Sequence, residues 1–286
     1  MELQFKILRN ENISQNYFKI TLNISHLQIP RPGQFYNIRC SSTTDPLLRR
    51  PFSLHRLIQD GKSLHMEILY RVVGKGTEWL SKRQKGESLD MIGPFGNGFT
   101  THDEIDHILL VARGIGIAPL YAVGEEALKK KNGKIIILIG ARIKERIFYE
   151  EECKKLGEVF LYTDDGSKGF HGKAPDLLSH LLESNKLPER FSLYACGPGP
   201  MLKDLAEIAK RFSLPGQAAL EGHLGCGFGA CLSCVIPLRP QSIKRNKQWE
   251  KPALQWSEDR RLVYSLICKD GPVYDIQEVD WDEWIA

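Results

Sequence analysis

The sequence predicts a multidomain protein in which a small β-barrel or sandwich is followed by a doubly wound parallel α/β sheet and a small β-rich C-terminal domain. Residues 1–100 hold short runs rich in Ile, Val, Phe, Tyr and Leu, separated by Pro, Gly, Asn and Asp. Residues 101–215 alternate short apolar runs with helix-like segments, which is typical of a parallel sheet. Residues 216–286 concentrate Gly and Cys and end in strand-like and acidic segments.

The individual elements follow from the position of each apolar run. The first domain is expected to form strands over residues 4–8, 18–22, 34–40, 53–57, 64–72 and 88–92. The second is expected to form strands buried on both faces over residues 108–111, 134–139, 159–162 and 191–195. Helical segments are expected up to residue 131, over 145–156 and 175–182, and up to residue 212.

Composition and charge exclude several classes of protein. Hydrophobic residues make up 42% and charged residues 26% of the 286 residues, which is a globular balance and excludes a disordered chain. The net charge of +4 gives no argument for a nucleic-acid partner. No apolar run approaches the length of a membrane span, and the start MELQFKILRN lacks the apolar region of a signal peptide. We therefore expect a cytoplasmic protein with no membrane partner.

The strongest chemical signal is a group of cysteines near the C-terminus. Their spacing, C-x4-C-x2-C followed by a distant fourth cysteine, is the plant-type spacing of a 2Fe-2S cluster. Small residues between them allow the backbone to approach the cluster sulfurs. A structural zinc site or buried free thiols are the alternatives, although zinc sites usually pair two separate C-x2-C knuckles. The predicted iron ligands are Cys226, Cys231, Cys234 and Cys268.

Two motifs in the first domain suit a dinucleotide. In the sequence R-P-F-S an arginine can reach a phosphate, an aromatic ring can stack on a planar ring, and a hydroxyl can bond a ring nitrogen. Alone, this tetrapeptide is more often an ordinary strand start. Downstream, Y-R-V-V-G-K-G-T offers a glycine turn whose N–H groups and threonine hydroxyl suit a pyrophosphate. The predicted cofactor-binding residues are Arg50, Pro51, Phe52, Ser53, Tyr70, Gly74, Gly76 and Thr77.

Three further motifs follow predicted strands of the second domain, at the sheet edge where open α/β folds bind ligands. Gly114 and Gly116 belong to a G-x-G-x-x-P sequence that suits a nucleotide pyrophosphate. Asp164 and Asp165 can hold sugar hydroxyls and would repel a ribose 2′-phosphate, so we expect NADH to be preferred over NADPH. A polar turn is the alternative for these acids. Predicted cofactor-binding residues from the last motif, C-G-P, are Cys196 and Gly197.

In the order R-P-F-S, G-x-G-T, G-x-G-x-x-P and C-G-P, the motifs resemble the ferredoxin-NADP reductase superfamily. The cysteine loop, with C-K-D-G-P-V-Y at 268–274 and E-V-D-W at 278–281, is similar to one family within it, the electron-transfer subunits of type-B, NAD-linked dihydroorotate dehydrogenase. The resemblance covers essentially the whole chain. It implies a Greek-key barrel that binds FAD over 1–100, an NAD-binding domain over 101–215 and a 2Fe-2S domain over 216–286.

The resemblance also implies roles for particular residues. Arg50 would meet the FAD pyrophosphate, which Gly76 and Thr77 would also hold, while Phe52 and Ser53 would lie beside the isoalloxazine. NADH would give a hydride to FAD, and the cluster would pass single electrons. No side chain is expected to be catalytic, because the cofactors carry the electrons. The implied partner is an FMN-containing catalytic subunit of pyrimidine biosynthesis, in a heterotetramer of two catalytic and two electron-transfer subunits.

Two features of the sequence differ from that family, and two alternative functions therefore remain open. Arg113 stands where the family has small glycines, and 33 residues separate Cys234 from Cys268, far more than is typical. The additional residues 239–261 are expected to be a surface excursion, in which Trp249 and Trp256 could contact a partner. One alternative is an NAD(P)H-dependent reductase subunit of a hydrogenase, a sulfite or sulfide system, or a ferredoxin reductase. The other is a zinc-stabilised, non-catalytic nucleotide-binding module.

Overall fold

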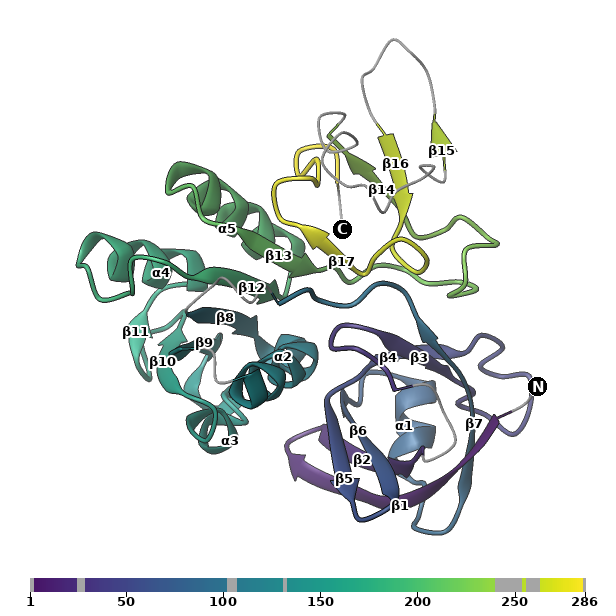
Figure 1. Ribbon diagram of the computed structural model, residues 1–286. Helices are drawn as coiled ribbons and strands as arrows, with labels where there is room; N and C mark the ends of the chain where they lie inside the picture. Colours follow the sequence, from purple (N-terminus) through teal and green to yellow (C-terminus); the bar gives the residue numbers. More distant parts are fainter. Residues whose placement is uncertain are drawn as a thin grey trace.

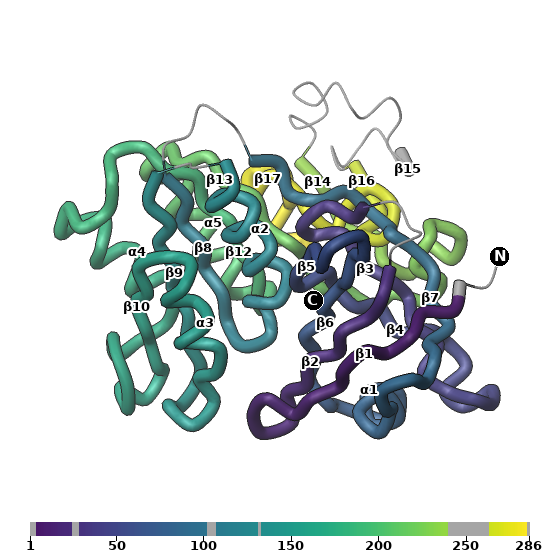
Figure 2. Tube along the Cα trace, turned by 60° about the horizontal axis from the view of Figure 1, so that its bottom comes forward, coloured from purple at the N-terminus to yellow at the C-terminus, as the bar shows by residue number. Residues whose placement is uncertain are grey.

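The computed structural model describes residues 3–24, 29–101, 107–130, 133–239, 254–255 and 263–284. Figure 1 shows an antiparallel sheet and a parallel sheet side by side, with the C-terminal segment lying across both. The tube in Figure 2 follows the same order from purple to yellow. Most of the spacer 239–261, including Trp249 and Trp256, lies outside the described residues.

The first sheet has seven strands, all paired antiparallel, in the order β4-β3-β7-β1-β2-β6-β5. Its apolar side chains pack into an interior that includes Ile20, Tyr36, Ile68 and Leu80. The short helix α1 (Lys75–Ser81) follows β6. The strands are β1 (Leu3–Ser14), β2 (Tyr17–Asn23), β3 (Phe35–Ile38), β4 (Arg50–Ser53), β5 (Arg56–Asp60), β6 (Ser63–Arg71) and β7 (Ser88–Phe95).

The single strand expected over residues 53–57 is wrong, because the chain changes its pairing partner there. β4 ends at Ser53 and β5 begins at Arg56. Between them, the Leu54 N–H bonds the carbonyl of Gln34 beside β3, whereas the His55 N–H bonds the carbonyl of Glu67 on β6. An apolar run in the sequence does not show which neighbour each N–H group will meet.

The second sheet has the order β11-β10-β9-β8-β12-β13-β17, parallel except for the last pair. The predicted parallel sheet is therefore confirmed. Two strands, β13 and β17, come from the part of the chain beyond residue 215. The strands are β8 (Ile108–Arg113), β9 (Ile135–Ala141), β10 (Glu158–Thr163), β11 (Phe170–His171), β12 (Ser192–Cys196), β13 (Gly216–Ala219) and β17 (Val273–Asp275).

Helices cover both faces of this sheet. Along β8, Leu109 and Val111 pack into the core beneath α4 (Ala174–Glu183) and α5 (Gly199–Arg211), whereas Ile108 and Leu110 pack into the core beneath α2 (Ile117–Lys130). This explains the continuous apolar runs of the strands.

The helix expected over residues 145–156 is much shorter. A 3₁₀ turn, η2 (Lys144–Arg146), is separated from α3 (Glu150–Lys154) by Tyr149, whose φ of 68° is left-handed. A left-handed residue cannot continue a right-handed helix, so α3 begins only after it.

The C-terminal segment forms a small antiparallel sheet against the parallel one. Its order is β14-β16-β15, from β14 (Val235–Leu238), β16 (Val263–Leu266) and β15 (Leu254–Gln255). Ile236 and Ile267 share a core with α5, and the Trp281 indole N–H bonds the carbonyl of Ile276 at 2.8 Å. Among the described residues there is no helix of the length and hydropathy needed to cross a membrane.

Candidate functional site

A cleft of about 540 Å³ lies where the two larger sheets and the C-terminal segment meet. One wall comes from β4 and the end of β6, and the opposite wall comes from the start of α2 and the end of β12. Four separate sequence motifs therefore reach one cavity. The predicted residues that line it are Arg50, Pro51, Phe52, Ser53, Tyr70, Thr77 and Cys196.

Strand register decides which side chains of R-P-F-S face this cleft. Ser53 is paired with Phe35 on β3, and both line the cleft. Phe52 is paired with Tyr36 and packs into the interior of the first sheet, although it also contributes to the cleft lining. There Phe52 is only 8% exposed and meets the Tyr70 ring edge-on at 5.8 Å. Ser53 is therefore more open to a ligand than the aromatic residue beside it.

Arg50 lies beside the turn that precedes α1. Its Nη1 donates to the carbonyl of Leu48 at 2.7 Å, and its Cγ would be 3.3 Å from a Cβ at Gly76. The Thr77 hydroxyl accepts the Gly74 N–H at 3.2 Å and thereby braces the turn. This arrangement brings a guanidinium and a backbone turn together, and both are groups that bind phosphate. Gly74, which is exposed, and Gly76, which is buried, are not among the residues that line the cleft.

The G-x-G and C-G-P loops are in direct contact. A Cβ at Gly116 would overlap the Cys196 carbonyl, so only glycine allows the two loops to meet. Gly114 has a φ of +56°, and Ile115 between the two glycines lines the cleft. Burial, and secondarily the negative charge of Glu221, raises the pKa of the Cys196 thiol well above its ordinary value. Cys196 therefore stays protonated at neutral pH.

Asp164 is engaged within the chain. Both of its carboxylate oxygens accept hydrogen bonds from Arg113, at 2.9 and 2.6 Å. This bidentate pair joins the end of β8 to the residue after β10, across the end of β9, which lies between these two strands. The Arg113 hydrogen bond holds the pKa of Asp164 below its usual value. Asp165 accepts the N–H and hydroxyl of Ser167, which lowers its pKa too. Neither acid lines the cleft, nor does Gly197, which packs against Met201.

Glu221 is a cleft residue that sequence analysis gave no role. It lies two residues after the end of β13 and lines the cavity together with Cys196. The residue is exposed overall, but burial of its carboxyl group raises the pKa of that group. Its position just after a strand of the parallel sheet could have indicated a ligand-binding role, but that strand was not predicted.

The four C-terminal cysteines form two pairs. The Cys226 sulfur accepts the N–H of Cys231 at 3.4 Å, and the Cys231 sulfur accepts the N–H of Cys226 at 3.3 Å. The sulfurs of Cys234 and Cys268 lie 3.3 Å apart, and the Cys268 N–H approaches the Cys234 sulfur at 3.5 Å. Backbone N–H groups thus collect around thiol sulfurs, as a site for thiolates requires.

The two pairs have different surroundings. Slight burial raises the pKa of Cys226, but N–H groups of Phe228, Cys231 and Ala230 outweigh it and lower this pKa to about 6. Burial and the neighbouring Cys234 raise the pKa of Cys268 to about 12. In the described part of the chain, no three His, Cys, Asp or Glu side chains are placed to hold a single metal ion.

The cysteine loop rests on the first sheet. A Cβ at Gly227 would overlap the amide nitrogen of Asn37, and Gly227 has a φ of +78°. Asn37 is buried, and its Nδ2 has no hydrogen-bond partner among the described residues. Asn37 is paired with Pro51, a lining residue of the cleft. The loop and the cleft therefore approach the same part of β3 and β4.

Comparisons with known proteins agree with this arrangement. Residues 110–207 match the family model for the oxidoreductase NAD-binding domain. The chain is 38% identical to the dihydroorotate dehydrogenase B (NAD(+)) electron transfer subunit of Geobacillus kaustophilus, over 93% of this chain and 94% of that protein. It is 36% identical to the protein of the same name from Desulforamulus reducens, over 88% of this chain and 87% of that protein.

Two solved structures share the fold, one over nearly the whole chain and one over three quarters of it. A chain of the NADH-dependent reduced ferredoxin-NADP oxidoreductase, studied for flavin-based electron bifurcation, is 27% identical with a TM-score of 0.77, covering 98% of this chain and 90% of its own. The ferredoxin reductase of carbazole 1,9a-dioxygenase is 19% identical with a TM-score of 0.63, covering 75% of this chain and 67% of its own. The second likeness concerns the fold alone.

Proposed function

The chain belongs to the family of dihydroorotate dehydrogenase B electron transfer subunits, and from that premise we propose that its cleft holds FAD and receives the nicotinamide of NAD(H). The observation that carries the proposal is that one cavity joins the R-P-F-S strand, the G-x-G-x-x-P loop and the C-G-P loop. FAD, when bound, exchanges a hydride with NAD(H) and single electrons with an iron–sulfur cluster. The protein serves as an oxidoreductase subunit for a catalytic partner subunit.

The residues present fit a flavin dinucleotide. Arg50 and the backbone of the turn at Gly74 and Gly76 would hold the pyrophosphate, with Thr77 bracing that turn. The Ser53 hydroxyl and the apolar surface beside it would orient the ring. On the opposite wall, the buried Cys196 would help to exclude water and would keep its thiol proton near the ring, because its pKa is raised well above the ordinary value. Glu221 would lie beside it at the same wall.

The cysteines fit a 2Fe-2S cluster better than a single zinc ion. Each iron of such a cluster takes two protein ligands, and the chain supplies two pairs. We assign Cys226 with Cys231 to one iron and Cys234 with Cys268 to the other. The contact of Gly227 with Asn37 would place this cluster beside the flavin cleft, as transfer of single electrons between the two requires.

The nucleotide would run from the cleft over Gly114 and Gly116 toward Asp164 and Asp165. Arg113 and Asp164 form a closed ion pair at that edge, so the pair offers neither a free cation for a 2′-phosphate nor a fully free carboxylate. The preference for NADH then depends mainly on Asp165, whose carboxylate is held by Ser167. Stopped-flow reduction with NADH and NADPH tests this choice.

The finer organisation is also part of the proposal. The antiparallel sheet would act as the Greek-key FAD barrel over residues 1–100, followed by the NAD domain over 101–215 and the cluster domain over 216–286. The cluster domain would share the parallel sheet with the NAD domain through β13 and β17. The partner would carry FMN and oxidise dihydroorotate to orotate in a heterotetramer of two catalytic and two electron-transfer subunits. The names of the relatives favour this partner over a hydrogenase, a sulfite or sulfide system, or a ferredoxin.

Anaerobic purification with the co-expressed catalytic subunit tests the proposal directly. We expect about one FAD, two iron atoms and two acid-labile sulfides per chain, together with flavin reduction by NADH. Stoichiometric zinc without sulfide would contradict the cluster assignment. A colourless protein that NADH does not alter would contradict the proposed function as a whole.

A further inference from the structure

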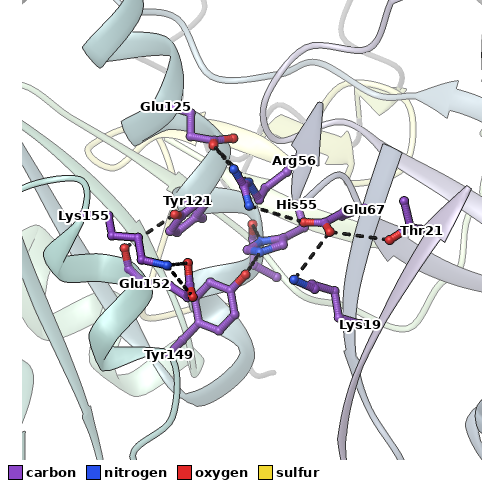
Figure 3. Close-up of polar contacts among 11 residues, drawn as sticks. Lys19, Thr21, His55, Arg56, Glu67, Tyr121, Glu125, Tyr149, Glu152 and Lys155 are labelled. Atoms are coloured by element: carbon purple, nitrogen blue, oxygen red, sulfur yellow. Dashed lines mark hydrogen bonds and ion pairs between the residues drawn. The ribbon is translucent and has the colours of Figure 1, made fainter. Parts of the chain in front are cut away.

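A buried polar network joins the antiparallel sheet to the α2 side of the parallel sheet, outside the cofactor motifs (Figure 3). His55 lies at its centre and is fully buried. It follows Ser53 by two residues, just beyond the end of β4. Its partner Ala118 lies in the first turn of α2 and lines the opposite wall of the cleft. One imidazole therefore connects the two walls between which FAD and NAD(H) are proposed to bind.

The hydrogen bonds of His55 define its tautomer. Nδ1 lies 2.9 Å from the Ala118 carbonyl oxygen, which can only accept, so Nδ1 carries the proton. In a neutral ring Nε2 then accepts, and the Tyr149 hydroxyl donates to it at 2.6 Å. Burial lowers the pKa of His55 to about 3, so the ring stays neutral around physiological pH. Both nitrogens are satisfied, and both partners belong to the other domain.

Tyr149 has an unusual backbone for this role. Its φ of 68° and ψ of 12° are left-handed, which is a strained conformation for a bulky side chain. Such strain persists only where the surroundings impose it. Here the ring stands at right angles to Tyr121 and edge-on to His55, at 5.4 and 5.0 Å between centroids. Burial raises the pKa of Tyr149, so the hydroxyl keeps the proton that it donates.

Arg56 makes a second link across the same interface. Its guanidinium donates to Glu125 of α2 at 2.9 Å and lies over the Tyr121 ring at 5.3 Å. On its own sheet it faces the buried Glu67 at 3.7 Å, which Lys19 also approaches at 3.4 Å. Figure 3 shows Arg56 and His55 side by side, contacting Glu125 and Tyr149 respectively. Two consecutive residues thus connect the sheet to α2 and to the residue preceding α3.

We propose that His55, together with Tyr149, is a positioning element for hydride transfer, which sets the separation of the flavin wall and the nicotinamide wall of the cleft. The inference rests on the proposed function. Hydride transfer needs the two rings in close, aligned contact, and a misplacement of about 1 Å can cost about 100-fold in rate. A hydrogen bond from the end of β4 to the first turn of α2 holds that spacing without either group touching the cofactors.

The test compares three variants of the holoenzyme. His55→Phe keeps a ring but removes both hydrogen bonds, His55→Asn keeps a donor near the Nδ1 position, and Tyr149→Phe removes one hydroxyl. The measurements are FAD content, the charge-transfer absorbance formed with NAD(H), and the rate of flavin reduction at saturating NADH. We expect full FAD content throughout. His55→Phe should lose the charge-transfer band and at least about tenfold in reduction rate, with substantial recovery in His55→Asn.

A matched control is Tyr194→Phe. Tyr194 is buried and donates its hydroxyl to the Thr100 carbonyl at 3.1 Å, away from the His55 network, so its reduction rate should stay at the wild-type value. If His55→Phe does not fold, Tyr149→Phe alone tests the inference. This variant should show an intermediate loss of the charge-transfer band and of the flavin reduction rate. Wild-type band and rate in every variant that folds would overturn the inference while leaving the proposed function intact. A wild-type protein without FAD, or one that NADH does not reduce, would instead contradict the proposed function.

Discussion

Two of the contacts between the first sheet and the rest of the molecule, the one at His55 and the one at the cysteine loop, are built differently. At the His55 interface the imidazole has a partner at each nitrogen, and the adjacent Arg56 is paired with two acids. At the cysteine loop, sulfurs gather backbone N–H groups, and the buried amide nitrogen of Asn37 has no partner among the described residues. At His55 the polypeptide itself supplies every hydrogen-bond partner. At the cysteine loop, the backbone N–H groups and the thiols are the groups that an iron–sulfur cluster would use. The difference suggests distinct roles: the His55 contact would hold the two walls of the cleft in position, and the cysteine loop would bind a cluster.

The largest effect should come from removing a ligand at the binding contact. Cys231→Ser should abolish the cluster, because a sulfur of the exposed pair is lost. NADH should still reduce FAD, whose site is formed elsewhere. Electron delivery to the catalytic subunit should fall by more than the ~100-fold cost of losing an outer-shell partner. Iron content, EPR and coupled turnover measure this.

Cys153→Ala is the matched control for that variant, because this buried cysteine lies in α3 and away from the loop. It should keep its iron and its turnover. A Cys231→Ser protein that lacks the cluster and still delivers electrons at the normal rate would show that FAD donates directly to the partner and that the C-terminal cysteines are merely structural.

The next effect concerns the phosphate end of the cleft. Arg50→Ala removes a charged donor that is proposed to meet the FAD pyrophosphate, and should weaken FAD binding by about 1.5–3 kcal/mol, or roughly 10- to 150-fold in Kd. Arg49→Ala is the control, since Arg49 is paired with Asp90 at 2.7 Å and does not line the cleft. Fluorescence titration of the FAD-depleted protein measures both. Equal weakening in the two variants would argue against a specific phosphate contact.

A smaller effect tests how closely the loop must approach β3. Gly227→Ala places a Cβ on the Asn37 amide at a φ of +78°, so the loop should shift and lose cluster. The backbone strain alone costs about 1–2 kcal/mol. Gly61→Ala, with a φ of +57° and open space around it, bears only the backbone strain. Iron content should separate the two variants; equal iron in both would mean that the Asn37 contact is dispensable.

The smallest effect is a pH dependence at the positioning contact. His55 has a pKa lowered to about 3 in the folded protein, against 6.5 in the unfolded chain. Below pH 6.5 the unfolded chain therefore binds a proton that the folded one does not. The stability that His55 contributes is complete above pH 6.5 and declines at lower pH by about 1.4 kcal/mol per unit. Urea unfolding at pH 7, 6 and 5 should show this slope in the wild type.

The difference between wild type and His55→Asn isolates that contribution, since all other titrating groups remain. The variant should have a flatter slope over the same range. Identical slopes in the two proteins would mean that His55 takes up its proton at the same pH in the folded and unfolded states, and that the network in Figure 3 does not lower its pKa.

Much of the arrangement could be predicted because the responsible signals are local. Continuous apolar runs indicated the parallel strands, and the parallel sheet is confirmed. The R-P-F-S sequence was placed on a strand, but only its pairing with β3 shows that Phe52 is mostly buried in the interior whereas Ser53 is more open to the cleft. Glu221 received no role because the Gly- and Ala-rich strand before it lacks a β pattern.

The sequence by itself determined the kinds of chemistry available: four thiols at cluster spacing, glycine turns for phosphates, and a strand–helix alternation that places loops at one sheet edge. These depend on spacing within short segments, which chain geometry fixes directly. Only the tertiary structure decided which of these groups meet, such as Gly116 with Cys196, Arg113 with Asp164, and His55 with Ala118. Such contacts join residues from 51 to 80 positions apart, and their energies depend on burial and orientation that no local pattern encodes.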